Sequence, residues 1–158
     1  MKTFFIATSN TGKQKEIEKF AALYGSDVTV TFPDETSAIN VDESGSTFEE
    51  NALLKARAYQ ASINDSSMYY VGDDSGIVIP ALGGEPGVFT RRWAGYEMSD
   101  EEILDYCMTK MKDLKGDERK AIFETVLAVI SPDGATEYFH GKMHGHILEQ
   151  PLDVEPQS

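Results

Sequence analysis

Short apolar runs alternate with amphipathic segments in the first part of the chain, and this pattern predicts strands that alternate with helices. Residues 4–7 form an uninterrupted apolar run typical of a buried strand, and residues 28–32 alternate in polarity like a second strand. Between them, residues 12–24 place apolar side chains at helical spacing. The chain therefore opens as strand, helix, strand.

A long amphipathic helix is expected over residues 47–62. Thr47 with Glu50 three residues later forms a capping-box pattern at its start. Residues 68–71 then form an apolar run that reads as another strand, and the glycine-flanked segment 72–76 is expected to end it in a turn.

The rest of the chain is expected to supply a further short strand, a loop dense in turn residues, one helix and a hairpin. These are residues 77–80, residues 82–87, a helix capped at Ser99 that ends near Gly116, and strands over 121–130 and 136–147 that turn at 131–134. The order predicts an α/β protein with a mixed sheet flanked by helices.

Composition limits the class of protein. A chain of 158 residues suits a single domain over residues 1–158. The 14 Lys and Arg against 27 Asp and Glu give a net charge of -13, which argues against nonspecific binding of nucleic acid. No segment approaches membrane-spanning length, and the single Cys107, expected in the core, fits a reducing compartment, so we expect a cytoplasmic protein with no membrane partner.

Two adjacent carboxylates, Asp73 and Asp74, follow the strand expected over residues 68–71. Side chains at strand ends commonly form sites in α/β sheets, and paired carboxylates there are able to hold a metal ion. The flanking Gly72 and Gly76 fit an ordinary turn equally well. These residues alone leave both interpretations open.

The segment from Ser9 to Lys13 lies between the first strand and the first helix. Unpaired amides and the positive end of the helix dipole favour an anion there, and a phosphate group fits. The spacing of a P-loop is absent. Because Ser9 and Asn10 also suit simple helix capping, a phosphate site and a cap both stay open.

Glu43 precedes the second helix, and Asn51 and Lys55, four residues apart, share one face of that helix. A cation and an amide beside an acidic pair suit a metal with polyphosphate, because Mg²⁺ takes one or two carboxylates and completes its shell with phosphate oxygens and water. The alternative is a solvated helix face. We favour that alternative for Glu49 and the site for Glu50 and Lys55.

Four segments, in this order and spacing, closely resemble the signatures of the inosine triphosphate pyrophosphatase family. They are ATSNTGKQKE, ESGSTFEENALLKA, GDDSGIVIPALGGEPG and TRRWAG. The resemblance implies an elongated α/β fold of two lobes with the site in a central cleft, usually as a homodimer. It also implies Mg²⁺-dependent hydrolysis of nucleoside triphosphates, typically of deaminated purines such as inosine and xanthosine triphosphates, to the monophosphate and pyrophosphate.

The same resemblance implies roles for residues at matching positions. Asp74 is expected to orient or deprotonate the attacking water with Asp73 in support, and Glu43 with Asp74 is expected to bind Mg²⁺. The substrate contacts that it implies are Ser9, Asn10, Lys13, Lys55, Ser75, Gly76 and Arg92.

The resemblance weakens toward residue 151. Relatives normally continue past the strand that reaches Ile147 into an aromatic-rich segment that reads the base, and residues 151–158 match none of it. We therefore expect the family's base-recognition segment to be absent. The alternative to an active enzyme is a catalytically weak or inactive protein that binds nucleotide or polyphosphate.

Two further groups are candidates for binding. Phe89, Trp93 and Tyr96 are able to stack on a base, although core or dimer packing is the competing interpretation. The histidines at 140, 144 and 146 share parity on a predicted strand, which suggests a transition-metal module as a third function. Strand positions six apart span about 20 Å, too far for one ion without a bulge.

Overall fold

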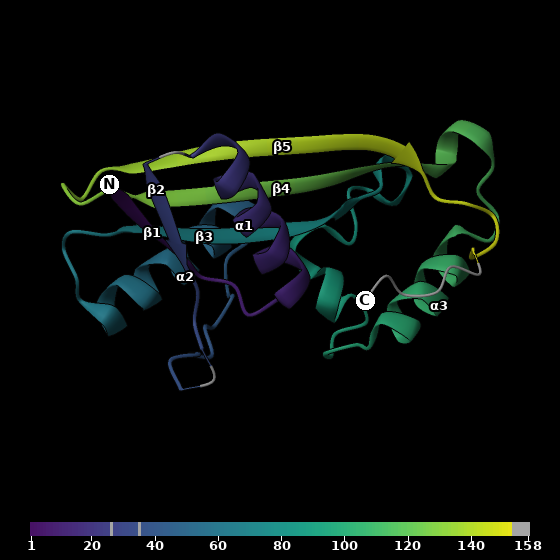
Figure 1. Ribbon diagram of the computed structural model, residues 1–158. Coiled ribbons are helices and arrows are strands. Elements are labelled where there is room, and N and C mark those ends of the chain that lie inside the picture. Colours follow the sequence, from purple (N-terminus) through teal and green to yellow (C-terminus); the bar gives the residue numbers. More distant parts are fainter. Residues whose placement is uncertain (26, 35, 153–158) are drawn as a thin grey trace. The chain divides into compact units, whose positions relative to one another are not determined.

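The computed structural model describes residues 1–25, 27–34 and 36–152 (Figure 1). Its strands form one sheet in the order β2-β1-β3-β4-β5. The elements in chain order are β1 (Lys2–Ile6), α1 (Thr11–Tyr24), β2 (Val28–Thr31), α2 (Phe48–Ile63), β3 (Tyr69–Val78), the 3₁₀ turns η1 (Pro80–Leu82) and η2 (Gly87–Arg92), α3 (Asp100–Met111), the 3₁₀ turn η3 (Gly116–Arg119), β4 (Lys120–Ile130) and β5 (Thr136–His146).

The α/β fold class is confirmed. The structure contains the strands predicted at 4–7 and 28–32, the helices predicted at 12–24 and 47–62 and the predicted hairpin, with ends within two residues of those expected. The helix predicted after Ser99 is also present but is shorter than expected. Figure 1 shows β4 and β5 side by side as the green and yellow-green strands of the hairpin. Its turn closes with the N–H of Ser131 bonded to the carbonyl of Ala135 at 2.9 Å.

The chain divides into two compact units. Unit 1 comprises Met1–Asp74 with Val126–His140, and unit 2 comprises Ser75–Thr125 with Gly141–Ser158. Strand β3 passes from the first into the second at the bond between Asp74 and Ser75. The single domain expected from chain length stays a prediction.

Unit 1 is built around the parallel strand β1. It pairs with β2 on one side, Phe4 opposite Val30, and with β3 on the other, Phe4 opposite Tyr69. Apolar side chains of the strands pack against one face of α2 in a core that excludes water and stabilises the unit. That core comprises Phe5, Ala7, Ala56, Tyr59, Tyr70 and Ile130.

Unit 2 has a core of its own around Ile79, Met111 and Ala121. Cys107 packs against this core, as expected from its helical pattern, and burial raises the pKa of its thiol. Helix α3 begins with a full capping box, in which Ser99 accepts from the Glu102 N–H at 3.2 Å and Glu102 accepts from the Ser99 N–H at 2.8 Å.

The expected end of the strand at Asp73 and Asp74 is wrong. Strand β3 continues through both carboxylates to Val78, so residues 72–76 are extended strand and not a turn. Gly72 has a packing role instead: a Cβ on it would lie 1.9 Å from the carbonyl oxygen of Ala52. Only the absence of a side chain lets α2 approach β3 this closely.

Two other expectations need correction. Helix α3 ends at Met111, earlier than the predicted end near Gly116, and Gly116 instead begins η3. The capping box at Thr47 is only half as expected. Thr47 accepts from the N–H of Glu50 at 3.1 Å, but the Glu50 carboxylate accepts from the N–H of Ser46 at 2.6 Å.

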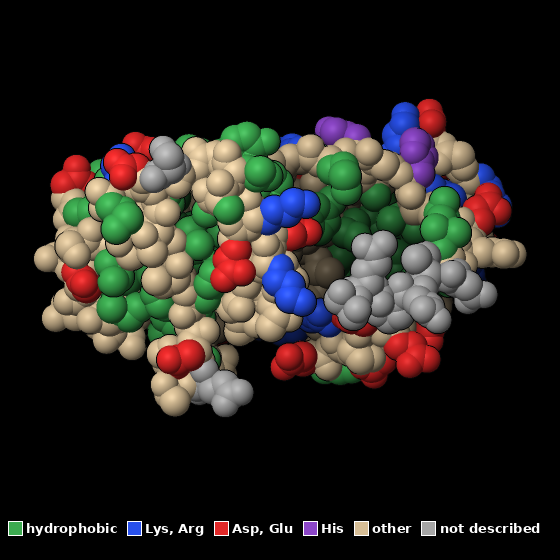
Figure 2. All heavy atoms as spheres, in the orientation of Figure 1, with side chains coloured by type: hydrophobic (Ala, Val, Ile, Leu, Met, Phe, Trp, Pro, Cys, Tyr) green, Lys and Arg blue, Asp and Glu red, His purple; other side chains and the backbone are tan. Residues whose placement is uncertain are grey.

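Within the described part of the chain, the helices are too short or too polar to span a bilayer. Acidic side chains appear at many separate places on the face shown in Figure 2, as the net charge of -13 leads one to expect.

Candidate active site

The site lies where the winding of the sheet reverses. From β1 the chain crosses through α1 to β2 on one side, and it later returns through α2 to β3 on the other side of β1. Ligands of open α/β sheets bind at the carboxyl ends of the strands at such a switch point. Here Thr8 follows β1 and Asp73 lies on β3, each two residues beyond the pair Ile6 and Val71.

The loop after β1 is organised by its own polar groups. Asn10 is the N-cap of α1, and its Oδ1 accepts from the N–H of Lys13 at 3.1 Å. Buried Thr8 accepts from the N–H of Asn10 at 3.3 Å, and Gln14 donates to the carbonyl of Thr8 at 2.9 Å. The capping interpretation is confirmed for Asn10, while a phosphate contact by Ser9 and Asn10, both exposed, stays a prediction.

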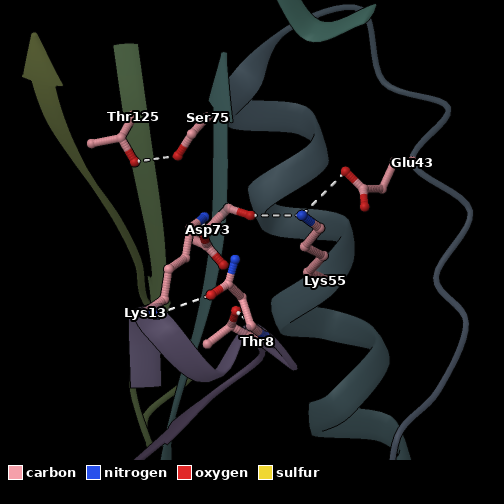
Figure 3. A network of polar contacts seen from close by, with 8 residues as sticks. Thr8, Lys13, Glu43, Lys55, Asp73, Ser75 and Thr125 are labelled. Carbon is pink, nitrogen blue, oxygen red and sulfur yellow. Dashed lines mark hydrogen bonds and ion pairs between the residues drawn. The ribbon is translucent and has the colours of Figure 1, made fainter. Parts of the chain in front are cut away.

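Two lysines converge on Asp73 from different helices (Figure 3). From the first turn of α1, the ammonium of Lys13 forms an ion pair with the Asp73 carboxylate. From α2, Lys55 donates to the backbone carbonyl of Asp73 at 2.8 Å and pairs with the Glu43 carboxylate at 3.1 Å. Since the Lys55 side chain is only 18% exposed, its charge is held at the strand and not in solvent.

The second carboxylate has a different partner. Asp74 is buried, and its Oδ2 accepts from the Nδ2 of Asn51 at 3.0 Å. Asn51 and Lys55 share a face of α2 as predicted, and each reaches one residue of the acidic pair. The close approach at Gly72 explains this, because it brings that face of the helix against β3.

The remaining predicted residues belong to unit 2. Ser75 lies next to Asp74 on β3 and shares a hydrogen bond of 2.7 Å with the hydroxyl of Thr125 (Figure 3). Gly76 is buried in the same strand, and exposed Arg92 is the last residue of η2. Their predicted contacts with substrate stay predictions.

Glu50 does not join the acidic pair, contrary to expectation. It is exposed, and its carboxylate accepts from both the N–H and the hydroxyl of Ser46, at 2.6 and 2.9 Å. The backbone bond from Ser46, followed by the hydroxyl bond, holds the pKa of the Glu50 carboxyl below its usual range. Glu50 therefore shapes the loop between Glu43 and α2.

Sequence reasoning did not assign Thr8 and Gly72 to this site, and it placed Asn51 beside the acidic pair without predicting its bond to Asp74. Thr8 anchors the loop after β1, Gly72 lets α2 approach, and Asn51 binds Asp74. A signal existed for Asn51, since an amide on the same helical face as Lys55 has to find polar partners when it is buried. For Gly72 the neighbouring Asp-Asp-Ser-Gly sequence pointed instead to a turn.

The two other candidate groups have different outcomes, and base stacking by the aromatic residues stays a prediction. Trp93 packs against the unit 2 core and its Nε1 donates to Glu85 at 2.8 Å, whereas Phe89 and Tyr96 are about half exposed. The histidines are exposed along β5, and His140 lies 3.5 Å from Glu49. Among the residues described, no three or more His, Cys, Asp or Glu side chains gather in a way that could hold a metal ion, so the histidine metal module is contradicted.

The carboxylates of Glu43 and Asp74 suit a hard cation that also binds oxygen atoms of a ligand. Glu43 and Asp74 offer oxygen only, which matches the preference of Mg²⁺ for one or two carboxylates completed by phosphate oxygens and water. A cage made wholly of protein ligands needs more carboxylates than these two. The residues present therefore fit Mg²⁺ bound together with a polyphosphate.

Fold and site together define an α/β protein with cations and carboxylates just beyond the parallel pairing of β1 with β3, a class suited to phosphate-bearing ligands. Comparison with known families agrees. The model of the Ham1 family matches residues 4–155, and the chain belongs to this family.

Curated relatives and solved structures support the assignment, which confirms the predicted family resemblance. A dITP/XTP pyrophosphatase of Symbiobacterium thermophilum is 39% identical over 95% of this chain and 72% of its own length, and one of Thermus thermophilus is 42% identical over 92% and 68%. A HAM1 protein from Coxiella burnetii superposes with a TM-score of 0.82 at 30% identity, covering 96% of this chain and 76% of that structure.

Proposed function

We propose that this protein hydrolyses nucleoside triphosphates of deaminated purines, such as inosine and xanthosine triphosphates, to the monophosphate and pyrophosphate in the presence of Mg²⁺. The observation that carries the proposal is the pair of lysines on Asp73, beside the buried Asp74, at the switch point of the sheet. The names of the relatives, dITP/XTP pyrophosphatase, support this substrate class. Removal of such nucleotides keeps them out of the cellular pool.

The cations are proposed to receive the triphosphate. Lys13 and Lys55 neutralise its charge, and Ser9 and Asn10 lie at the N-terminus of α1, where the helix dipole favours an anion. The Lys13 side chain is 39% exposed, so its ammonium is able to exchange Asp73 for a phosphate oxygen. Ser75, Gly76 and Arg92 are proposed as further substrate contacts.

The hydrolytic step follows from the carboxylates. A water oxygen attacks the α-phosphorus, its proton passes to the Asp74 carboxylate, and the bond from the α-phosphorus to the bridging oxygen breaks with its electron pair leaving on pyrophosphate. Asp73 supports this step by holding Lys13.

Glu43 and Asp74 are the residues that would hold Mg²⁺. When bound, the ion would neutralise charge that develops on the triphosphate oxygens. Because Glu43 also pairs with Lys55, the same loop links the metal-binding carboxylate to a phosphate-binding cation.

The proposal extends to assembly and location. We propose a homodimer in the cytoplasm that binds neither nucleic acid nor membrane. The acidic net charge supports the first exclusion, and Phe20, Leu23 and Tyr24 support an interface, because these apolar side chains of α1 are more than half exposed. Sedimentation equilibrium tests the dimer: a monomer at micromolar concentration would contradict it.

One assay tests the activity. The protein is incubated with Mg²⁺ and inosine, xanthosine, adenosine or guanosine triphosphate, and released pyrophosphate and monophosphate are measured beside nucleotide binding. We expect pyrophosphate and monophosphate in equal amounts, fastest from the deaminated purines. Binding without release would instead support the catalytically weak nucleotide-binding protein, and release of single phosphates would contradict the proposed bond cleavage.

A further inference from the structure

Asn51 is among the largest side chains that the fold buries completely. It lies in the second turn of α2 and is 1% exposed, next to Ala52, which is fully buried. An amide in such a position must satisfy both its oxygen and its nitrogen, because an unpaired buried polar group is costly. An apolar side chain would fill the space without this requirement, so the choice of an amide needs a reason.

The two ends of the Asn51 amide meet two different segments. Its Oδ1 accepts from the backbone N–H of Gly45 at 2.8 Å, and its Nδ2 donates to the Asp74 carboxylate at 3.0 Å. Because a backbone N–H only donates and an ionised carboxylate only accepts, these partners determine which way the amide faces.

The contact with Gly45 is tight. A Cβ on Gly45 would lie 2.6 Å from the Oδ1 of Asn51 and 2.7 Å from the Cβ of Glu50. The loop therefore lies directly on the start of α2 at this point, two residues beyond Glu43. Any shift of the Asn51 side chain must move the loop, Asp74 or both, since packed interiors have little free space.

We propose that Asn51 is a positioning residue that holds Asp74 and the loop bearing Glu43 in one fixed arrangement. The proposal rests on the proposed function, in which these two carboxylates bind the metal and Asp74 takes the proton. Asn51 itself contacts neither water nor phosphate in this scheme. It acts through the orientation of Asp74, as groups that hydrogen-bond to metal ligands commonly do.

The informative substitution is Asn51→Asp, because it replaces the NH₂ group of the side-chain amide by an oxygen and leaves the size of the side chain nearly unchanged. The acceptor for Gly45 is kept, but the donor to Asp74 is lost and two carboxylates face each other. We expect kcat for pyrophosphate release to fall about 10- to 100-fold. The KM for the triphosphate should change much less, because Lys13 and Lys55 are untouched.

A matched control is Asn64→Asp. It makes the same chemical change at the C-cap of the same helix, at an exposed residue outside the site. We expect kcat and KM close to those of the unaltered protein. If N51D is too unstable to assay, Asn51→Ser replaces it, since a hydroxyl is too short to reach both partners and should lower kcat likewise.

A readout independent of activity comes from exchanging the two groups. In the double variant Asn51→Asp with Asp74→Asn, position 74 donates and position 51 accepts, so one hydrogen bond is restored without two facing carboxylates. We expect the double variant to recover most of the thermal unfolding midpoint lost by N51D, while turnover stays lost because Asp74 is gone. If the losses of the unfolding midpoint in the two single variants simply add in the double variant, the two side chains are not coupled, and the proposed contact between Asn51 and Asp74 is overturned.

The outcomes separate this proposal from the proposed function. The positioning role is overturned if kcat is unchanged in N51D, or if KM rises by the same factor by which kcat falls. Either result is possible even when the protein is an active pyrophosphohydrolase. If the unaltered protein releases no pyrophosphate, the proposed function fails and the positioning role for this reaction fails with it. The exchange variant still reports separately whether Asn51 holds Asp74.

Discussion

Each of the two units places cations against backbone carbonyls, but with different consequences. In unit 1, Lys55 donates to one carbonyl and also pairs with Glu43, while partly exposed Lys13 pairs with Asp73. In unit 2, Arg119 is 4% exposed and donates to four carbonyls, at 2.5 to 3.1 Å. The four accepting carbonyls belong to Met111, Leu114, Ile147 and Leu148.

The difference lies in what each cation is able to exchange. Carboxylate partners at an accessible position can be replaced by phosphate oxygens, so the lysines are suited to a ligand that comes and goes. The carbonyls around Arg119 are fixed parts of the chain, two of them at and just after the end of α3 and two just after β5. The identity of the partners therefore distinguishes a cation suited to an exchangeable ligand from one that is fixed in the structure.

The largest expected effect is on turnover, in the variant Asp74→Asn. We expect kcat for pyrophosphate release to fall by about 10² to 10⁴, the usual contribution of a general base, with nucleotide affinity retained. Steady-state assays with inosine triphosphate and calorimetric binding of a non-hydrolysable analogue measure the two quantities. Turnover close to that of the unaltered protein would remove Asp74 from the mechanism.

Arg119→Met should lower the stability of the protein, in contrast to Asp74→Asn, which should lower its turnover. It removes the donor of four carbonyls, one of them in a buried and three in partly buried hydrogen bonds. Because a buried polar group left unsatisfied costs about 1–3 kcal/mol, we expect the free energy of unfolding to fall by about 3 kcal/mol. Urea denaturation measures this loss. The neighbouring exposed cation offers the control Lys120→Met, which should change stability little because surface ion pairs contribute little. Equal effects of the two substitutions would contradict the structural role of Arg119.

Gly72→Ala should affect stability and turnover together, because it forces α2 away from β3. Overpacking of this kind costs about 1–3 kcal/mol, and the displaced helix carries Asn51 and Lys55. Denaturation and the pyrophosphate assay measure both effects. Gly145→Ala is the control, since a Cβ there meets nothing within 4 Å. A fully stable and active G72A protein would show that the close approach is not required.

The smallest expected effect belongs to the cap of α3. Ser99→Ala removes the acceptor for the Glu102 N–H and should lower the free energy of unfolding by about 1 kcal/mol, with kcat per folded molecule unchanged. Thermal denaturation of S99A beside Ser99→Thr, which keeps a hydroxyl, measures the cap alone. A drop in kcat would mean that α3 contributes to the site.

Much of the fold was predictable because helices and strands follow from local periodicity. Helix α1 and the hairpin of β4 and β5 begin and end close to the residues that the apolar spacing indicates. The same reasoning failed at residues 72–76, where two glycines and two aspartates have the composition of a turn. There the pairing of β3 with its neighbours outweighs local preference, and the strand continues to Val78.

The sequence by itself determined which chemical groups are present and which short segments carry them: two lysines, three carboxylates and a capped helix after the first strand. Tertiary structure decided which of them meet. Lys13 and Asp73 are 60 residues apart and Asn51 and Asp74 are 23 apart, distances over which periodicity carries no information. Their contacts depend on the parallel pairing of β1 with β3 and on the missing side chain of Gly72, and both are properties of the packed chain.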